Sequence, residues 1–254
     1  MIHQELENAI LTIVMDRADK KNALVPEMYR DMGLALENAS KPESGVKVII
    51  VKGAANCFTA GNDVAQFAKA VNQSNPSLKD TYHFMHALLH CPLPVIAQVE
   101  GLAIGIGTTL LLHCDFVICH KNTKFAMPFI NLGLVPEYAS SFIIPRIAGN
   151  LVAKKLLMLG ESFGSDQALE WGFVTKIADD NLQHEVDSLA LKLANKPALA
   201  LMQTKKLINH DTTEVSEHID RELEIFVEAM QSPPAKEAFA AFLEKREINK
   251  TYFK

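Results

Sequence analysis

Short apolar runs rich in β-branched residues alternate with helix-like segments through the first half of the chain. Residues 10–15 and 46–51 are such runs, and between them 26–39 carries apolar residues at helical spacing with a proline near its start. The same alternation recurs from 94–99, through a helix-like stretch, to 115–119. Strands separated by helices favour a layered α/β core in which the strands pair in parallel.

The second half of the chain is mostly helical in pattern. Beyond Gly149, helices are predicted over 151–159, 165–171, 182–194, 197–208, 215–230 and 234–246, and only 173–177 resembles a strand. The Lys196-Pro197 pair marks a boundary, because proline favours a helix start and disfavours helix in the residue before it. We therefore predict a core of residues 1–195 and a C-terminal helical module of residues 196–254.

Size and charge narrow the possible functions. A chain of 254 residues with 48% hydrophobic residues can bury a large core. The net charge of −5 argues against nucleic acid as the main ligand, and no basic block suggests an anionic membrane. The four cysteines contain no CxxC pair and indicate reduced thiols. Because no signal-like leader and no apolar stretch of ~20 residues is found, we expect a cytoplasmic protein.

Two glycine-containing turns have the composition of anion-binding sites. Residues 101–109 read GLAIGIGTT, follow the apolar run at 94–99 and open a helix, and residues 58–63 read FTAGND. Glycine allows close approach of the backbone, and the free N–H groups at a helix start carry the positive end of its dipole. Considered without other context, Asn62 and Asp63 are better explained as ordinary helix N-caps.

Three competing motifs are disfavoured by their context. Residues 160–164 read GESFG and match the nucleophile elbow of serine hydrolases, yet they lie between two predicted helices rather than after a strand. His83, His86 and His90 share a helical face but lack the HExxH carboxylate, so amphipathic packing is favoured over a metal site. Leu110 replaces the third glycine of a dinucleotide fingerprint, so NAD binding is not expected.

Several segments in order along the chain together resemble the crotonase (enoyl-CoA hydratase/isomerase) superfamily. They are the loop 16–24, the two glycine turns, the strand and loop at 125–136, the helix and turn at 160–174, and the last helix at 238–246. Each segment is common alone, but their joint order is specific. The resemblance implies an α/β fold with a crotonase-like ββα spiral core and a C-terminal helical oligomerisation module.

By this resemblance, the backbone N–H groups of Asn62 and Ile106 form an oxyanion hole for a thioester oxygen. Many family members have glycine at the position of Ile106, but a β-branched residue keeps the backbone donor. The alternative is a pair of helix starts whose N–H groups bind only water.

The resemblance also indicates which chemistry to expect. Family hydratases use two glutamates, and aligning the segments puts Thr109 and Phe129 at those positions. Glu137 instead matches the glutamate of the Δ3-Δ2-enoyl-CoA isomerase branch. This implies an isomerase that shifts a 3-enoyl-CoA double bond to the 2-trans position, with Glu137 as proton carrier.

Other interpretations remain open. Outside the family context, Glu137 would be an acidic residue in the first turn of a helix at 138–144, where the helix dipole stabilises it. Within the family, alternatives are another activity, such as enoyl-CoA hydration with a water held by Glu137 alone, and a non-catalytic acyl-CoA-binding protein.

Coenzyme A is expected only as the carrier part of an acyl-CoA substrate, with no separate cofactor and no metal. The resemblance implies contacts to it from Lys21, Ala23, Leu24 and Ala60, and from Phe242 and Lys245 of a neighbouring subunit. In this family the helical tail packs subunits into trimers, often paired into hexamers. Apolar residues at helical spacing over 215–230 fit that role, although packing within one chain would give the same pattern.

Overall fold

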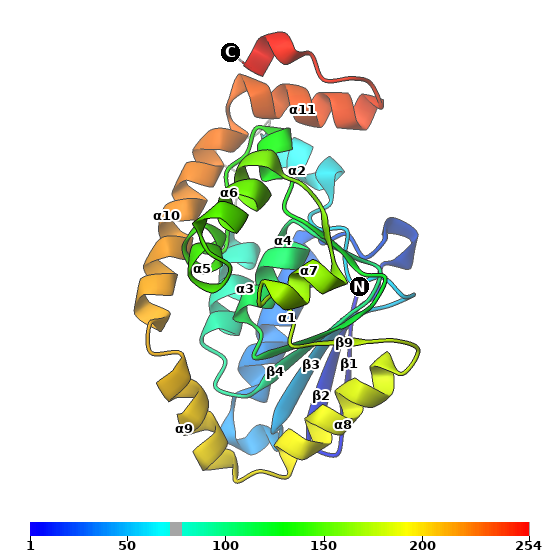
Figure 1. The fold of residues 1–254 in the computed structure, drawn as a ribbon, viewed down its shortest axis with the longest axis vertical. Coiled ribbons are helices and arrows are strands. Elements are labelled where there is room, and N and C mark those ends of the chain that lie inside the picture. The colour runs from blue at the N-terminus through cyan, green and yellow to red at the C-terminus, as the bar shows by residue number, and fades with distance from the viewer. Residues whose placement is uncertain (72–77, 254) are drawn as a thin grey trace.

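A six-stranded sheet forms the centre of the computed structural model, which describes residues 1–71 and 78–253 (Figure 1). In order across the sheet, the strands are β1 (Ile2–Glu7), β2 (Ile10–Met15), β3 (Val48–Gly53), β4 (Val95–Val99), β6 (Phe116–His120) and β9 (Lys176–Ala178). β1 pairs antiparallel with β2, and the remaining neighbours pair in parallel. The predicted α/β core with parallel pairing is confirmed.

A smaller sheet lies next to the carboxyl ends of the main strands. It contains β5 (Leu102–Ile104), β7 (Lys124–Ala126) and β8 (Phe163–Gly164), with β7 in the middle. β5 follows β4 after a turn at Gly101, and β7 follows β6 after a short connection at residues 121–123. The second glycine turn therefore starts from the end of this small sheet.

Eleven helices surround the sheets in the described part of the chain. They are α1 (Pro26–Ala39), α2 (Val64–Val71), α3 (Lys79–Leu89), α4 (Ile106–Thr109), α5 (Ser140–Ile147), α6 (Asn150–Leu159), α7 (Ser165–Glu170), α8 (Leu182–Ala194), α9 (Ala198–Ile208), α10 (Thr212–Met230) and α11 (Pro233–Glu244). The short 3-10 helices η3 (Leu110–His113) and η4 (Phe129–Leu132) matter for the site described below.

Both faces of the main sheet are covered at its centre, which explains why β2, β3 and β4 are largely apolar rather than alternating, whereas the edge strand β1 is mostly exposed. On one face, buried residues of α1 and α3 join the strands in the main core. On the other face, Val186 and Ala190 of α8 are fully buried against Val48, Ile96 and Ile118 (Figure 1). The main core also extends to α10 and α11, through Ile219, Phe239 and other residues.

The C-terminal helices wrap the outside of the molecule. In Figure 1, α10 runs along one side and α11 crosses its end, next to α2. Lys196 and Pro197 lie in the short connection between α8 and α9, where a boundary was predicted. The division into domains 1–195 and 196–254 stays a prediction, since buried residues of α10 and α11 belong to the main core.

Three of the sequence-based expectations are wrong in detail. The helix predicted over 138–144 begins only at Ser140, because Tyr138 and Ala139 adopt left-handed conformations with φ of 58° and 54°. Glu137 therefore lies in a loop and not in the first turn of a helix. The strand predicted over 173–177 is β9, which begins at Lys176. The helix expected after Gly105 is α4 followed by the 3-10 turn η3.

The competing motifs are explained by ordinary packing. Residues 160–164 connect α6 to the short strand β8, so a helix precedes the turn where a nucleophile elbow requires a strand. His83 pairs with Glu37 at 2.8 Å, and His86 lies 3.4 Å from Asp220. Among the described residues, no group of three or more His, Cys, Asp or Glu side chains is arranged to hold a metal ion.

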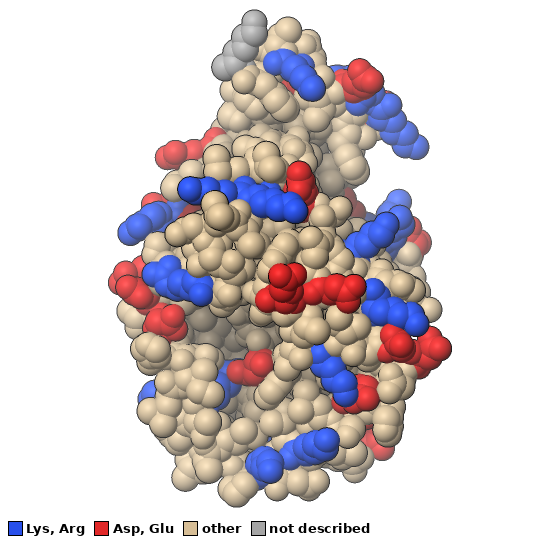
Figure 2. Space-filling model, viewed as in Figure 1, with Lys and Arg blue, Asp and Glu red and all other residues tan. Residues whose placement is uncertain are grey.

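The surface shows charges of both signs. Figure 2 shows Lys and Arg side chains interspersed with Asp and Glu over the face in view. In the part of the chain that the structure describes, no helix is both long and apolar enough to cross a membrane.

A buried ion pair joins the C-terminal helices to the main sheet. The Lys205 ammonium of α9 lies 2.7 Å from the Asp115 carboxylate, with side-chain exposures of 10% and 18%. Lys205 also donates to the Leu93 carbonyl at 2.8 Å, and Asp115 accepts the Val95 N–H at 2.7 Å. Removing the ammonium alone would leave a largely buried carboxylate without its counter-charge.

We expect Lys205→Met to lower the free energy of unfolding by about 3 kcal/mol, because a buried charge loses its partner. Urea denaturation followed by circular dichroism measures the change. Lys206→Met is the matched control, since Lys206 is exposed on the same helix. Equal stability of the two variants would contradict the role of the ion pair.

Candidate active site

The two glycine turns lie directly against each other. The Thr59 N–H donates to the Leu102 carbonyl at 2.8 Å, and the Ile104 N–H donates back to the Thr59 carbonyl at 3.1 Å. Gly61, with φ of 85°, packs so closely on Ile104 that a Cβ at this position would lie 2.6 Å from the Ile104 carbonyl oxygen. Only glycine fits there, and its small size brings the residues after each turn together.

These residues are Asn62 and Ile106, the two predicted oxyanion donors. Ile106 is the first residue of α4, after Gly105 with φ of 57°. Among the hydrogen bonds of the described residues, none uses the backbone N–H of Asn62 or of Ile106. Both residues line one cavity of about 250 Å³. Two unpaired N–H donors at such a site can stabilise a developing oxyanion, each by about 3 kcal/mol.

The side chains around the first turn hold it in place. The Tyr29 hydroxyl of α1 donates to Asn62 Oδ1 at 2.5 Å. The Asp63 carboxylate accepts from Arg17 at 2.6 Å and from the N–H groups of Ala65 and Gln66 at the start of α2. Burial opposes ionisation of Asp63, but these donors lower its pKa. Asp63 is thus the N-terminal cap of α2, while the Asn62 side chain bonds to Tyr29.

Glu137 lies in the loop between η4 and α5, and the residue is only 3% exposed. The Thr109 hydroxyl donates to its Oε1. Thr109 ends α4, one helical turn after Ile106, so α4 links the carboxyl to the second oxyanion donor. Tyr29, which bonds to Asn62, interacts electrostatically with the same carboxyl. The structure thus brings Glu137, Asn62 and Ile106 into one network.

The environment of Glu137 favours its protonated form. Burial raises the pKa of Glu137 to about 8, the Thr109 hydrogen bond opposes this, and the nearby Glu222 carboxyl adds to it. At neutral pH the group therefore carries a proton in the free protein. A carboxyl whose pKa lies near the working pH can both accept and return a proton.

The cavity next to the two turns is mostly apolar. Besides Asn62 and Ile106, it is lined by Ala60, Gly61, Val64, Phe67, Ile104, Gly105, Pro128, Phe129, Asn131, Leu132, Leu134, Phe239 and Phe242. Phe129 therefore forms part of its wall. Glu137 does not line the cavity in this structure, and its carboxyl is enclosed by protein.

The predicted coenzyme A contacts near the first turn divide into two groups. The Ala60 N–H donates to the Lys21 carbonyl at 2.9 Å, and Lys21 is exposed, while Ala60 lines the cavity. The Ala23 and Leu24 side chains are buried, and the Leu24 N–H donates to the Gly61 carbonyl at 2.8 Å. Ala23 and Leu24 thus support the turn, and all four roles in coenzyme A binding stay predictions.

The two predicted contacts from the last helix are both exposed. Phe242 on α11 lines the cavity of its own chain, and Lys245 follows directly after α11 with φ of 53°. Because α11 reaches the cavity within one chain, Phe242 can meet a ligand there without a neighbouring subunit.

Two residues of the site were missed in the sequence. Tyr29 is a tyrosine on the buried face of α1, and Glu222 is an acidic residue on the buried face of α10. Glu222 shares the helical spacing of Ile219 and Phe226, so a carboxylate at a core-facing position was a readable signal.

The raised pKa of Glu137 predicts a pH-dependent effect on stability. Between pH values of about 4.5 and 8, the folded protein holds a proton on Glu137 that the unfolded chain does not, so the stability of the wild-type protein falls as pH rises. Glu137→Gln removes this pH dependence, because the amide does not titrate. We expect the variant to gain a few kcal/mol relative to wild type from pH 5 to pH 9, since one pKa unit corresponds to about 1.4 kcal/mol.

Denaturation curves at pH 5 and pH 9 give the free energy of unfolding of wild type and of Glu137→Gln. The quantity to compare is the difference between the two proteins at each pH. A constant difference between wild type and Glu137→Gln across this range would show that Glu137 titrates normally.

Comparison with known proteins identifies the family of this chain. A model of the enoyl-CoA hydratase/isomerase family matches residues 5–251. The 1,2-epoxyphenylacetyl-CoA isomerase of Escherichia coli (strain K12) is 31% identical over 254 residues, covering 96% of each protein. A probable enoyl-CoA hydratase of Bacillus subtilis (strain 168) is also 31% identical, over 94% of this chain and 93% of its own length. The enoyl-CoA delta isomerase 2 of Homo sapiens is 33% identical, over 80% of this chain and 52% of its own length.

Solved structures show the same fold. Pseudomonas aeruginosa OdaA superposes with a TM-score of 0.91 at 40% identity, covering 95% of this chain and 98% of that one. An enoyl-CoA hydratase/isomerase from Pseudoalteromonas atlantica T6c gives a TM-score of 0.90 at 34% identity, covering 98% of both chains. The predicted crotonase-like α/β fold with a C-terminal helical region is confirmed. The chain belongs to the enoyl-CoA hydratase/isomerase (crotonase) family.

Proposed function

We propose that this member of the family is an isomerase that moves a 3-enoyl-CoA double bond to the 2-trans position, with Glu137 as the proton carrier. The observation that carries the proposal is the buried carboxyl of Glu137, joined by Thr109 to the helix that begins at Ile106. A 3-to-2 shift needs one base that takes a proton and returns it two carbons away, and one site that holds the enolate oxygen.

The atoms balance with these groups alone. The ionised Glu137 carboxylate takes a proton from C2 of the substrate, and the electrons move to the thioester oxygen to give a dienolate. The N–H groups of Asn62 and Ile106 stabilise the negative oxygen. Glu137 then returns its proton to C4, and the double bond forms between C2 and C3. No water enters or leaves.

Two side chains support isomerisation over hydration. By the family resemblance, Thr109 and Phe129 stand at the positions of the two hydratase glutamates. The Thr109 hydroxyl donates its hydrogen bond to Glu137, and the apolar Phe129 side chain lines the cavity. A mostly apolar cavity disfavours the addition of water.

Aromatic rings give the proposed acyl site its shape. Phe67 of α2 and Phe239 of α11 line the cavity with Phe129, and the Phe67 and Phe239 rings lie 6.2 Å apart. Phe226 of α10 contacts both Phe67 and Phe129 edge to face. Such a wall suits a flat conjugated acyl group. Coenzyme A would then extend past Ala60 toward Lys21.

The names of the relatives support acyl-CoA as the substrate class, and they include both isomerases and hydratases at similar identity. We further propose that the protein acts in the cytoplasm as a homotrimer or hexamer, which its exposed apolar residues Leu199, Leu207 and Ile208 on α9 would help to build.

We expect the purified protein to convert 3-hexenoyl-CoA to 2-trans-hexenoyl-CoA, and Glu137→Gln to lose at least 10³-fold in kcat, because the amide cannot accept the C2 proton. Acyl-CoA binding should persist in the variant, as measured by calorimetry. Retained turnover would remove Glu137 from the mechanism. Hydration of 2-trans-hexenoyl-CoA at a higher rate than isomerisation would favour the hydratase alternative, and binding without turnover would favour a binding protein.

The isomerase should be more active at alkaline pH. Because only ionised Glu137 can accept a proton, kcat/KM should rise about tenfold per pH unit up to a pH of about 8 and then level off. A rate that is constant from pH 5 to pH 8 would contradict a raised pKa for the base. Protein integrity at each pH is checked by circular dichroism.

A further inference from the structure

A second buried carboxyl lies behind the proposed base. Glu222 of α10 is 7% exposed. Its Oε1 accepts the Ser141 backbone N–H at 3.0 Å and also the Ser141 hydroxyl. Burial raises the pKa of Glu222, and the hydrogen bonds from Ser141 and from the neighbouring N–H groups of Ala139 and Ser140 oppose this rise. Glu222 thus caps the start of α5 from another helix, as an acidic N-terminal cap would do within one chain.

The cap closes the turn that carries Glu137. Tyr138 and Ala139, the two residues between Glu137 and α5, both adopt the left-handed conformation, which non-glycine residues rarely take. Such a turn persists only when surrounding contacts determine it. Tyr138 is fixed by its hydroxyl, which donates to the Met85 carbonyl at 2.9 Å, and by the His113 ring stacked on it. Glu222 fixes the other end.

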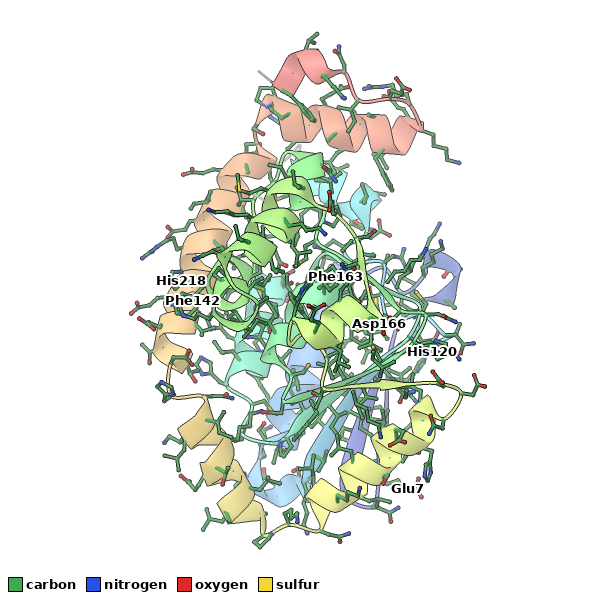
Figure 3. All side chains as sticks on the ribbon, in the orientation of Figure 1. Glu7, His120, Phe142, Phe163, Asp166 and His218 are labelled. Atoms are coloured by element: carbon green, nitrogen blue, oxygen red, sulfur yellow. The ribbon has the colours of Figure 1, made fainter. Side chains whose placement is uncertain are left out.

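The contact between α10 and α5 is reinforced one turn before Glu222. The His218 ring of α10 stacks on the Phe142 ring of α5, with centroids 4.1 Å apart (Figure 3). Because His218 and Glu222 are four residues apart, they lie on the same side of α10. This side of α10 therefore meets α5 through two successive contacts.

The two carboxyls are unequal in their hydrogen bonds. Glu222 receives donors from the start of α5, whereas Glu137 receives the Thr109 hydroxyl. Coupled buried acids share their protons according to such differences. Glu222 Oε2 is buried and has no hydrogen-bond partner among the described residues, but its Oε1 has more donors than the Glu137 carboxyl. Glu137 is thus the better site for the proton.

In the part of the chain that the structure describes, the other titratable groups that interact with Glu137 supply no compensating positive charge. Tyr29 from α1 and Tyr138 from the same loop are the further groups that interact with it, and burial raises the pKa of both well above the usual value. His113 from η3 stacks on Tyr138, and burial lowers its pKa to about 4, so it is neutral. Near Glu222, His218 stacks on Phe142, and Arg146 of α5 lies over the same ring.

We propose that Glu222 is a positioning residue of the isomerase: its carboxylate holds the turn between Glu137 and α5, and its negative charge adds to the effect of burial in keeping the proton on Glu137. This inference rests on the proposed function of Glu137. It makes the C-terminal helix α10 part of the proton chemistry, although Glu222 touches neither the cavity nor the substrate.

Two substitutions separate the two parts of the role. Glu222→Gln keeps an oxygen that can accept from Ser141 and removes the charge. We expect its kcat/KM to begin rising at lower pH than in wild type, so that the ratio of the value at pH 6 to the plateau increases several-fold. Glu222→Ala also removes the cap. We expect it to lower kcat at the plateau more than it changes KM, with a lower Tm.

Glu224→Gln is the matched control, because Glu224 is exposed on the same helix and its charge points away from the core. It should leave the pH profile unchanged. If Glu222→Gln and Glu224→Gln both have the wild-type profile, the electrostatic part of the proposal is wrong. If Glu222→Ala keeps the wild-type kcat, the positioning part is wrong.

A second readout does not depend on turnover. Infrared difference spectroscopy identifies the Glu137 carboxyl as the band that is absent in Glu137→Gln, and its midpoint can be followed against pH without substrate. A lower midpoint in Glu222→Gln than in wild type supports the coupling even if no isomerase activity is found, in which case the proposed function alone fails. An unchanged midpoint overturns the coupling even in an active enzyme.

Discussion

The contact between Gly61 and the Ile104 carbonyl determines where the site can form. Parallel strands bring the ends of β3 and β4 to one edge of the sheet, but strand pairing alone sets a spacing that leaves room for side chains between the loops that follow. Because Gly61 has no side chain, its backbone packs directly against the Ile104 carbonyl. Asn62 and Ile106, the residues after the two turns, then line one cavity.

Much of the fold was readable because it depends on local patterns. The apolar runs predicted β2, β3 and β4, and helical spacing with a leading proline gave the bounds of α1. The errors fall where tertiary contacts override local preference. The sequence near Tyr138 and Ala139 does not predict their left-handed conformation, since neither residue is glycine. The conformation depends on contacts from α3, η3 and α10.

The site was readable in part for the same reason. Glycines marked both turns, so the donors at Asn62 and Ile106 could be located before the structure, with the family resemblance to assign their role. The position of Glu137 in the sequence indicated a base, but its protonation depends on burial and on Glu222, which lies 85 residues further along the chain. Long-range electrostatics of this kind has no local signature.

The site draws on the whole length of the chain. Tyr29 comes from the first helix, while Phe239 and Phe242 come from the last one and reach over the cavity of their own chain. During synthesis, therefore, the glycine turns and the carboxyl of Glu137 emerge well before the cavity has its final wall. A ribosome-bound chain would present an open, hydrated surface at this place, and the apolar interior of the cavity would exist only after the last helices had docked.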